Sequence, residues 1–204
     1  DPVKFHSVTR NGDIKDVLSG ITAARDAGIL NIKTNTVLIR GFNDDELHDI
    51  LNYTWNVGVI PRFIEFMPLG DDVWKSDKFI SAVEILNMLS ESGNWVLQQK
   101  TAERGDAIPV GPTRYYTDNR TGRSVGIIEA VSNHFCDSCN RLRITASGVM
   151  MACLFSTNGV PLLELIRNKE KDRIKSAILS GINMKPDWWE ETRDGKQQMS
   201  GIGG

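Results

Sequence analysis

Three cysteines are the residues of this sequence best suited to do chemistry. Cys136 and Cys139 form a C-x2-C pair, a spacing that lets two thiolates on one tight turn reach the same metal. A C-x13-C interval then leads to Cys153, and its centre, Ala146–Gly148, has β-type residues on both sides. We expect this interval to fold as a hairpin that returns Cys153 to the neighbourhood of Leu142, so that the three sulfurs can converge.

Spacing alone leaves three interpretations of these cysteines open. They can be buried small hydrophobic residues without a ligand. They can bind a structural zinc ion, with His134 or Asp137 as the fourth ligand. They can also hold a [4Fe–4S] cluster, in which the iron without a cysteine stays free to bind a substrate atom. The number of ligands favours neither metal strongly.

Two arginines directly follow the C-x2-C pair. If residues 141–144 are extended, Arg141 and Arg143 share one face of the strand, while Leu142 and Ile144 occupy the other. Guanidinium groups bind phosphate through paired hydrogen bonds, so two of them beside a metal site predict an anionic substrate held against the metal. The alternative is an ordinary solvated strand face.

Further candidate residues lie in the first third of the chain. Lys33 and Asn35 alternate onto one face of a predicted buried strand, where a cation needs a partner. The alternative is that Lys33 stands at the start of the strand and reaches solvent through its long stem. Met67 precedes Pro68 at the end of the next strand and is by default a core residue. Only its position at the carboxyl end of a strand suggests a binding role.

The elements that must position these residues alternate in type over the first half of the chain. Apolar periodicity and capping residues predict helices, and β-branched runs predict strands. This alternation is typical of a parallel α/β sheet or barrel, whose sites lie at the carboxyl ends of the strands. The expected helices cover residues 13–29, 44–58 and 81–92, and the expected strands cover residues 32–39 and 62–67.

After Gly93 the pattern changes to short strands around Trp95, Tyr115 and Ile127. We interpret them as a second, antiparallel unit that contains the cysteines, followed by a helix over residues 169–182. The predicted domains are therefore residues 1–93 and 94–204, and the fold class is α/β at the start and α+β overall. From residue 184 onward the polar composition predicts a mobile tail.

The composition describes a folded chain without a broad charge bias. The 204 residues are 40% hydrophobic and 25% charged with a net charge of -2, so a core can form and no basic field points to nucleic acid. No apolar run approaches the ~20 residues of a membrane span, and three cysteines suit a reducing cytosol. We expect a cytoplasmic protein without a membrane or nucleic-acid partner. Its start at Asp1, without an initiator Met, suggests a piece of a longer protein.

Four segments of the sequence share one pattern with a known family: Asn31–Val37, Arg40–Glu46, Arg62–Pro68 and His134–Arg143. The C-x2-C-x13-C spacing and the terminal pair of glycines belong to the same pattern, which runs through nearly the whole chain. Together these features closely resemble the MoaA-type radical-SAM GTP cyclases of molybdenum cofactor biosynthesis.

The resemblance implies a lyase, GTP 3',8-cyclase, that converts GTP into the cyclic precursor of pyranopterin. It implies two [4Fe–4S] clusters, one that cleaves S-adenosyl-L-methionine and one that binds GTP through its open iron. The 5'-deoxyadenosyl radical then abstracts a ribose hydrogen, and the sugar radical attacks the purine. The implied fold is an incomplete β/α (TIM-like) barrel followed by a small antiparallel iron–sulfur domain. The implied partners are a second copy of the protein in a homodimer and the next enzyme of the pathway, which receives the product.

The resemblance also assigns roles to matching residues. No C-x3-C-x2-C motif occurs in the 204 residues, so we expect the radical-generating cluster to belong to a missing preceding part and this chain to be inactive alone. An alternative function is a non-catalytic binding module stapled by zinc. The implied roles are metal ligation by Cys136, Cys139 and Cys153, and GTP binding by Lys33, Arg141, Leu142 and Arg143. Asn35 and Met67 would bind S-adenosyl-L-methionine. Gly203 and Gly204 would enter the active site, because residues without side chains fit a crowded centre.

Overall fold

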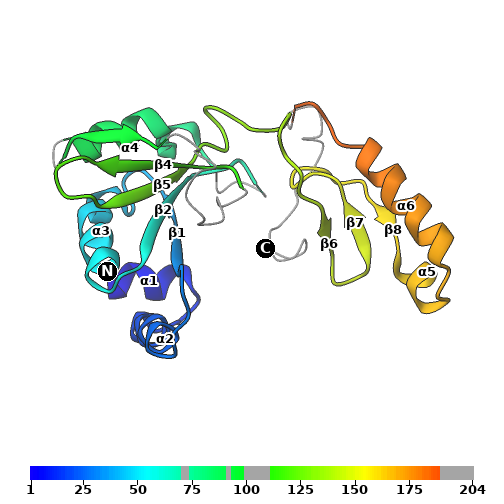
Figure 1. Ribbon diagram of the computed structural model, residues 1–204, viewed down its shortest axis with the longest axis horizontal. Coiled ribbons are helices and arrows are strands. Elements are labelled where there is room, and N and C mark those ends of the chain that lie inside the picture. Colours follow the sequence, from blue (N-terminus) through cyan, green and yellow to red (C-terminus); the bar gives the residue numbers. More distant parts are fainter. Residues whose placement is uncertain (70–73, 91–92, 99–110, 189–204) are drawn as a thin grey trace. The chain divides into compact units, whose positions relative to one another are not determined.

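The computed structural model describes residues 1–69, 74–90, 93–98 and 111–188 of the chain (Figure 1). The chain divides into two compact units, both of which contain helices and strands. Unit 1 consists of Asp1–Phe66 and Ser76–His134, and unit 2 consists of Met67–Lys75 and Phe135–Gly204. The expected combination of helices with strands, α+β overall, is therefore confirmed.

Unit 1 is built on a mixed sheet of five strands in the order β1-β2-β5-β4-β3. β1 (Lys33–Leu38), β2 (Ile60–Glu65) and β5 (Ser124–Ile128) run parallel. β4 (Thr113–Asp118) is antiparallel to β5 and to β3 (Trp95–Leu97). The two expected strands of the first half are thus present, and they form the parallel pair that the alternation of elements predicts.

The short strands expected after Gly93 are also present, as β3, β4 and β5. They belong to the unit 1 sheet because β5 pairs with β2, and they do not form a separate unit with the cysteines. The boundary of compact unit 1 accordingly differs from the division expected at residue 93. As an assignment of functional domains, that division stays a prediction.

The three expected helices of unit 1 are confirmed. Ends differ by a few residues from the expected ranges, as is usual where terminal turns fray. Unit 1 also contains one helix that the sequence pattern did not predict, in which Asp1 caps the first turn. The helices are α1 (Pro2–Val8), α2 (Ile14–Asp26), α3 (Leu47–Asn56) and α4 (Ala82–Ser90), with short 3-10 turns η1 (Asp44–Glu46) and η2 (Ser76–Lys78).

The core of unit 1 lies where α3 and α4 pack on one face of the sheet (Figure 1). Alternation along each strand sends every second side chain to this face, and burying one large apolar side chain contributes roughly 1.5–3 kcal/mol. The other face carries the remaining residues of each strand, which is where the candidate residues of β1 lie. The fully buried members of the core include Leu38, Leu47, Phe63, Ile85 and Ile127.

Unit 2 holds a second, smaller sheet of three antiparallel strands, β6 (Arg143–Ile144), β7 (Val149–Met151) and β8 (Val160–Pro161). Two helices, α5 (Leu163–Arg167) and α6 (Lys171–Asn183), lie beside this sheet (Figure 1). The expected helix over residues 169–182 is confirmed as α6, whereas α5 was not predicted. Among the described residues, no helix is both long and apolar enough to cross a membrane.

Candidate functional site

The C-x2-C pair lies on a tight turn at the start of unit 2. The Ser138 N–H donates to the Phe135 carbonyl at 3.2 Å, and the Cys139 N–H donates to the Cys136 carbonyl at 3.1 Å. These two successive turns bring both cysteines onto one short loop, as their spacing predicts. Neither cysteine is in a disulfide bond among the described residues, and both are partly exposed.

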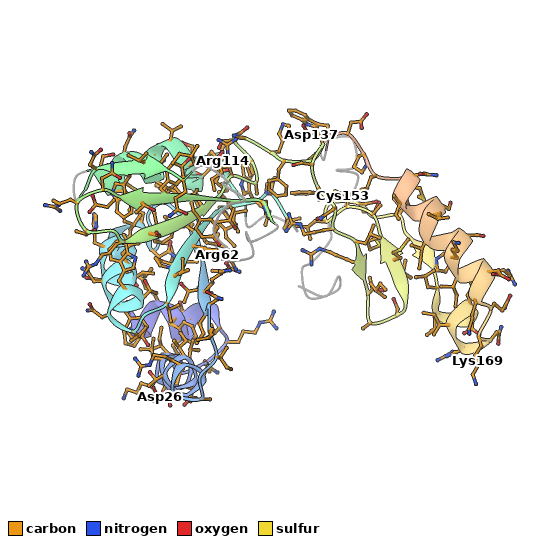
Figure 2. All side chains as sticks on the ribbon, in the orientation of Figure 1. Asp26, Arg62, Arg114, Asp137, Cys153 and Lys169 are labelled. Atoms are coloured by element: carbon orange, nitrogen blue, oxygen red, sulfur yellow. The ribbon has the colours of Figure 1, made fainter. Side chains whose placement is uncertain are left out.

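A hairpin carries the third cysteine back toward this loop. β6 pairs Arg143 with Met151, so Cys153 follows the end of the paired strands by two residues. The turn is closed by the Gly148 N–H, which donates to the Thr145 carbonyl at 2.9 Å with Gly148 at φ +75°, a conformation that glycine adopts easily. The predicted hairpin around Ala146–Gly148 is therefore confirmed, and the free thiol of Cys153 belongs to unit 2 (Figure 2).

One lysine connects the loop and the two arms of the hairpin. The Lys185 ammonium lies 3.5 Å from Cys139 Sγ, and it donates to the carbonyls of Arg141 at 2.9 Å and Ala152 at 3.1 Å. These carbonyls belong to residues adjoining the two arms of the hairpin. The expectation of a mobile tail from residue 184 onward is therefore wrong for Lys185, because composition does not record such a long-range contact.

The surroundings of Cys139 favour its thiolate form. Burial raises the pKa of the thiol, but the Arg141 backbone N–H and the positive charges of Lys185 and Arg141 outweigh burial and leave the pKa below its ordinary value. A thiolate is the form that binds metals and attacks electrophiles. The lowered pKa of Cys139 thus favours the form that metal ligation requires.

The donor set suits a thiolate-bound metal group in its chemistry. Three cysteines in one small unit, none of them in a disulfide bond among the described residues, are the ligand type that zinc and iron–sulfur clusters prefer. Within the part of the chain that the structure describes, no group of three or more His, Cys, Asp or Glu side chains is arranged to hold a single metal ion. The cysteines therefore share a loop and a hairpin, but they do not surround one common point.

The two arginines after the C-x2-C pair lie in the same unit. The Arg141 guanidinium stacks over the Phe135 ring at 5.0 Å, and Arg143 opens β6. The strand covers only Arg143 and Ile144, so the extended stretch expected over residues 141–144 is shorter than predicted. Among the described residues, neither guanidinium forms an ion pair with a carboxylate within 4.0 Å.

Lys33 and Asn35 lie in unit 1, on the face of the sheet opposite to α3 and α4. Asn35 is paired with Arg62 on β2, which is paired in turn with Gly126 on β5, and Gly126 is paired with Tyr115 on β4. These positions form one row across four strands (Arg62 is labelled in Figure 2). The strand alternation that placed Lys33 and Asn35 on one face is therefore confirmed.

Gly126 is the residue that makes this row possible. A Cβ at position 126 would lie 2.6 Å from Thr113 Cγ2, 2.8 Å from Arg62 Cγ and 3.1 Å from Tyr115 Cε1. The backbone of β5 thus leaves the space through which the Arg62 and Tyr115 side chains pass. Sequence reasoning missed both side chains, although Arg62 stands three residues before the core glutamate Glu65 of β2 and therefore on the opposite face of the strand.

The remaining candidate site residues are Met67, Gly203 and Gly204. Met67 follows β2 and is partly buried in unit 2. Gly203 and Gly204 lie outside the described residues. The roles assigned to Met67 and to both glycines stay predictions.

A buried carboxylate that sequence reasoning did not single out anchors the chain before the cysteines. Glu65 is 0% exposed, and its carboxylate accepts hydrogen bonds from the backbone N–H groups of Ala82 at 2.7 Å, Val131 at 2.7 Å and Ser132 at 2.8 Å, and from the Ser132 hydroxyl. Glu65 therefore fixes the first turn of α4 and the segment that leads into His134. The available signal was an acidic residue at a core position of an alternating strand.

Comparisons of the sequence with known proteins identify relatives of this chain. A family model described as Molybdenum Cofactor Synthesis C matches residues 59–191, which include all three cysteines and both arginines. A GTP 3',8-cyclase of Syntrophomonas wolfei is 38% identical over 100% of this chain, one of Thermodesulfovibrio yellowstonii is 35% identical over 100%, and one of Listeria monocytogenes is 35% identical over 98%. The chain spans 62% of the length of each of these relatives.

Proposed function

Because this chain belongs to the family described as Molybdenum Cofactor Synthesis C, we propose that it is the cluster-bearing, GTP-binding part of a GTP 3',8-cyclase, a radical-SAM lyase of molybdenum cofactor biosynthesis. The observation that supports the proposal most strongly is the presence of three cysteines and two arginines on one loop and hairpin inside the matched residues. Relatives named GTP 3',8-cyclase align with all or nearly all of the chain.

In this proposal Cys136, Cys139 and Cys153 hold a [4Fe–4S] cluster. Such a cluster does not need its ligands gathered around one ion, because each thiolate binds a different iron atom. The lowered pKa of Cys139 supports ligation in the thiolate form. When bound, the cluster would supply one iron without a cysteine ligand, to which the purine can bind.

The cationic and adjoining residues bind the rest of GTP. Arg141 and Arg143 carry like charges close together in sequence, and a triphosphate neutralises both while it forms paired hydrogen bonds. Leu142 lies between them and is proposed to line the same site. Lys33, which lies on the same face of the unit 1 sheet as Asn35, is also proposed to contact GTP.

The remaining proposed roles concern S-adenosyl-L-methionine and the active site. Asn35 and Met67 are proposed to contact this cofactor, and Gly203 and Gly204 to enter the active site. The cluster that cleaves the cofactor is proposed to lie in a part of the enzyme outside this chain, so the 204 residues alone do not catalyse. The parallel strands of unit 1 are accordingly proposed to be the last strands of an incomplete β/α barrel.

Partners and location follow from the same proposal. We infer a homodimer that passes its product to the next enzyme of the pathway. Cysteines that must stay reduced to bind a cluster favour the cytoplasm. GTP is the proposed small-molecule partner, and neither nucleic acid nor membrane is among the proposed partners.

Anaerobic reconstitution with iron and sulfide tests the proposal directly. We expect about four irons per chain and a visible absorption band that GTP perturbs. Cys153→Ser should lose this iron, whereas Thr157→Ala, an exposed substitution in the same unit, should retain it. The readouts are iron and zinc counting and a visible spectrum with and without GTP.

The alternative function is a non-catalytic module in which the cysteines hold structural zinc. Zinc binding would give a colourless protein with one tightly bound zinc ion and no iron uptake. That result would leave the family assignment intact but exclude the proposed role in GTP binding at a cluster.

A further inference from the structure

Lys185 occupies an unusual position relative to the candidate metal ligands. Its ammonium group contacts three acceptors: Cys139 Sγ at 3.5 Å, the Arg141 carbonyl at 2.9 Å and the Ala152 carbonyl at 3.1 Å. The two carbonyls lie beside the two arms of the hairpin, and Ala152 directly precedes Cys153. One side chain therefore connects the loop of the C-x2-C pair with the segment that carries the third cysteine.

We propose that Lys185 is a positioning residue for the metal ligands, which fixes Cys139 relative to Cys153 and supplies a positive charge and an N–H donor to the Cys139 sulfur. This inference rests on the proposed function, since it assumes that the cysteines hold an iron–sulfur cluster. It adds a residue that neither the spacing of the cysteines nor the predicted GTP contacts singled out.

Helix α6 delivers Lys185 to this position. Gly181 on α6 is buried against β7, where a Cβ would collide with the end of the Met150 side chain, so the helix approaches the hairpin closely. Beyond the helix end, the Lys185 N–H donates to the Ile182 carbonyl at 3.1 Å and fixes the backbone from which the side chain extends. The ammonium is thus held by the packing of α6 on the hairpin as well as by its own three contacts.

The chemistry of the three contacts explains why lysine suits the position. An ammonium has three donors in a compact, tetrahedral arrangement, which matches one sulfur and two carbonyl oxygens around one point. A guanidinium keeps the charge, but its donors lie in a flat fork that cannot converge in the same way. Methionine keeps the length and apolar stem of the side chain but offers no donor and no charge.

The differences between lysine, arginine and methionine at position 185 provide a test of the proposal. The wild-type chain, Lys185→Met and Lys185→Arg are each reconstituted anaerobically with iron and sulfide, and iron release to a chelator and the midpoint reduction potential of the cluster are measured. Partners that orient metal ligands typically change metal affinity 10–100-fold, so we expect iron release from Lys185→Met to be on the order of 10-fold faster.

The reduction potential separates a direct effect on the sulfur from a merely structural one. Removing a positive charge and a hydrogen bond from a ligand sulfur disfavours the reduced cluster, so the potential of Lys185→Met should fall. Lys185→Arg retains the charge and should keep the potential near the wild-type value while it releases iron faster. Lys175→Met, an exposed lysine on α6, is the matched control and should change neither quantity.

Two results would overturn the inference, and they differ in what else they overturn. If the wild-type chain takes up no iron, the proposed function fails and the role of Lys185 fails with it. If the wild-type chain holds its cluster and Lys185→Met matches it in iron release and potential, only the role of Lys185 fails. Circular dichroism of each variant checks that the chain is folded, and Lys185→Arg provides the same comparison if Lys185→Met does not fold.

Discussion

The two units of this chain are stabilised in different ways. In unit 1, four strands and two helices contribute to one hydrophobic cluster, and the large side chains of Phe63 and Ile85 are completely buried. In unit 2, the buried apolar residues come mainly from one hairpin and its flanks, around Met150 and Leu162. A small core provides little free energy of folding, and proteins of this kind often depend on a bound metal. Unit 1 is thus stabilised by its own core, whereas we expect the stability of unit 2 to increase when the proposed metal group binds its cysteines.

The two units also differ in the surroundings of one charged side chain in each, Glu65 and Lys185. Glu65 in unit 1 is completely buried and its carboxylate is fully engaged by backbone and hydroxyl donors, so it serves as a fixed structural anchor. Lys185 in unit 2 is partly buried and contacts a sulfur that can bind metal. A buried polar group surrounded by partners rigidifies a fold, whereas a partly exposed group beside a reactive atom can tune that atom.

The largest expected effect tests whether the scaffold is independent of the cysteine unit. Phe63→Ala removes a completely buried ring from the interior strand β2, and such substitutions cost about 3–5 kcal/mol. Hydrogen exchange should show this loss in the amides of β1, β2 and β5, while the amides of β7 and α6 keep their protection. An equal loss of protection in both units would mean that they unfold together.

The next effect concerns substrate binding in unit 2. Arg143→Ala should weaken GTP binding to the reconstituted chain by about 1.5–3 kcal/mol, which is the usual contribution of a hydrogen bond to a charged group. Calorimetric titration measures the change. Arg167→Ala is the matched control, because Arg167 lies in the same unit and pairs with Glu164 at 2.9 Å on α5. Unchanged affinity in Arg143→Ala would count against the proposed anion site.

A comparable effect is expected on the polar face of the unit 1 sheet. Gly126→Ala places a methyl group 2.6 Å from Thr113 Cγ2 and 2.8 Å from Arg62 Cγ, so the Arg62 and Tyr115 side chains must move. Overpacking of this kind costs about 1–3 kcal/mol. Thermal or urea unfolding measures the cost. A second variant, Gly126→Ala with Thr113→Ser, removes the nearest methyl group and should recover part of the loss; no recovery would show that the crowding lies elsewhere.

Sequence reasoning predicted local elements well because their signals are local. Helix α4 was expected over residues 81–92, and it begins with a capping box, a local signal, in which the Ser81 N–H donates to Glu84 Oε2 at 3.0 Å and the Glu84 N–H donates to Ser81 Oγ at 3.3 Å. The hairpin of unit 2 was predicted for the same reason, from a turn-forming centre between two β-type runs.

What the sequence could not predict depends on contacts between distant segments. β5 joins the sheet beside β2, and this pairing decided that three short strands belong to unit 1. Likewise, Lys185 lies 46 residues after Cys139, and no periodicity or spacing relates the two. Strand order and the neighbours of a site are properties of the whole fold, so they emerged only from the structure.

The smallest expected effect is a pH-dependent change in the stability of unit 1. The Ser81 backbone N–H and the Arg40 guanidinium hold the pKa of Glu84 below its ordinary value, so its charge stabilises unit 1 above about pH 4.5, and this stabilisation is lost as pH falls through the lowered pKa. Glu84→Gln keeps a capping side chain but removes the charge. Because the Glu84 side chain is about half exposed, we expect a loss of less than about 1 kcal/mol at pH 7 and a smaller loss at pH 3. Urea unfolding of both proteins at the two pH values measures the difference, and hydrogen exchange should locate it in α4. A loss at pH 3 as large as that at pH 7 would contradict the electrostatic explanation and point to altered packing at the start of the helix.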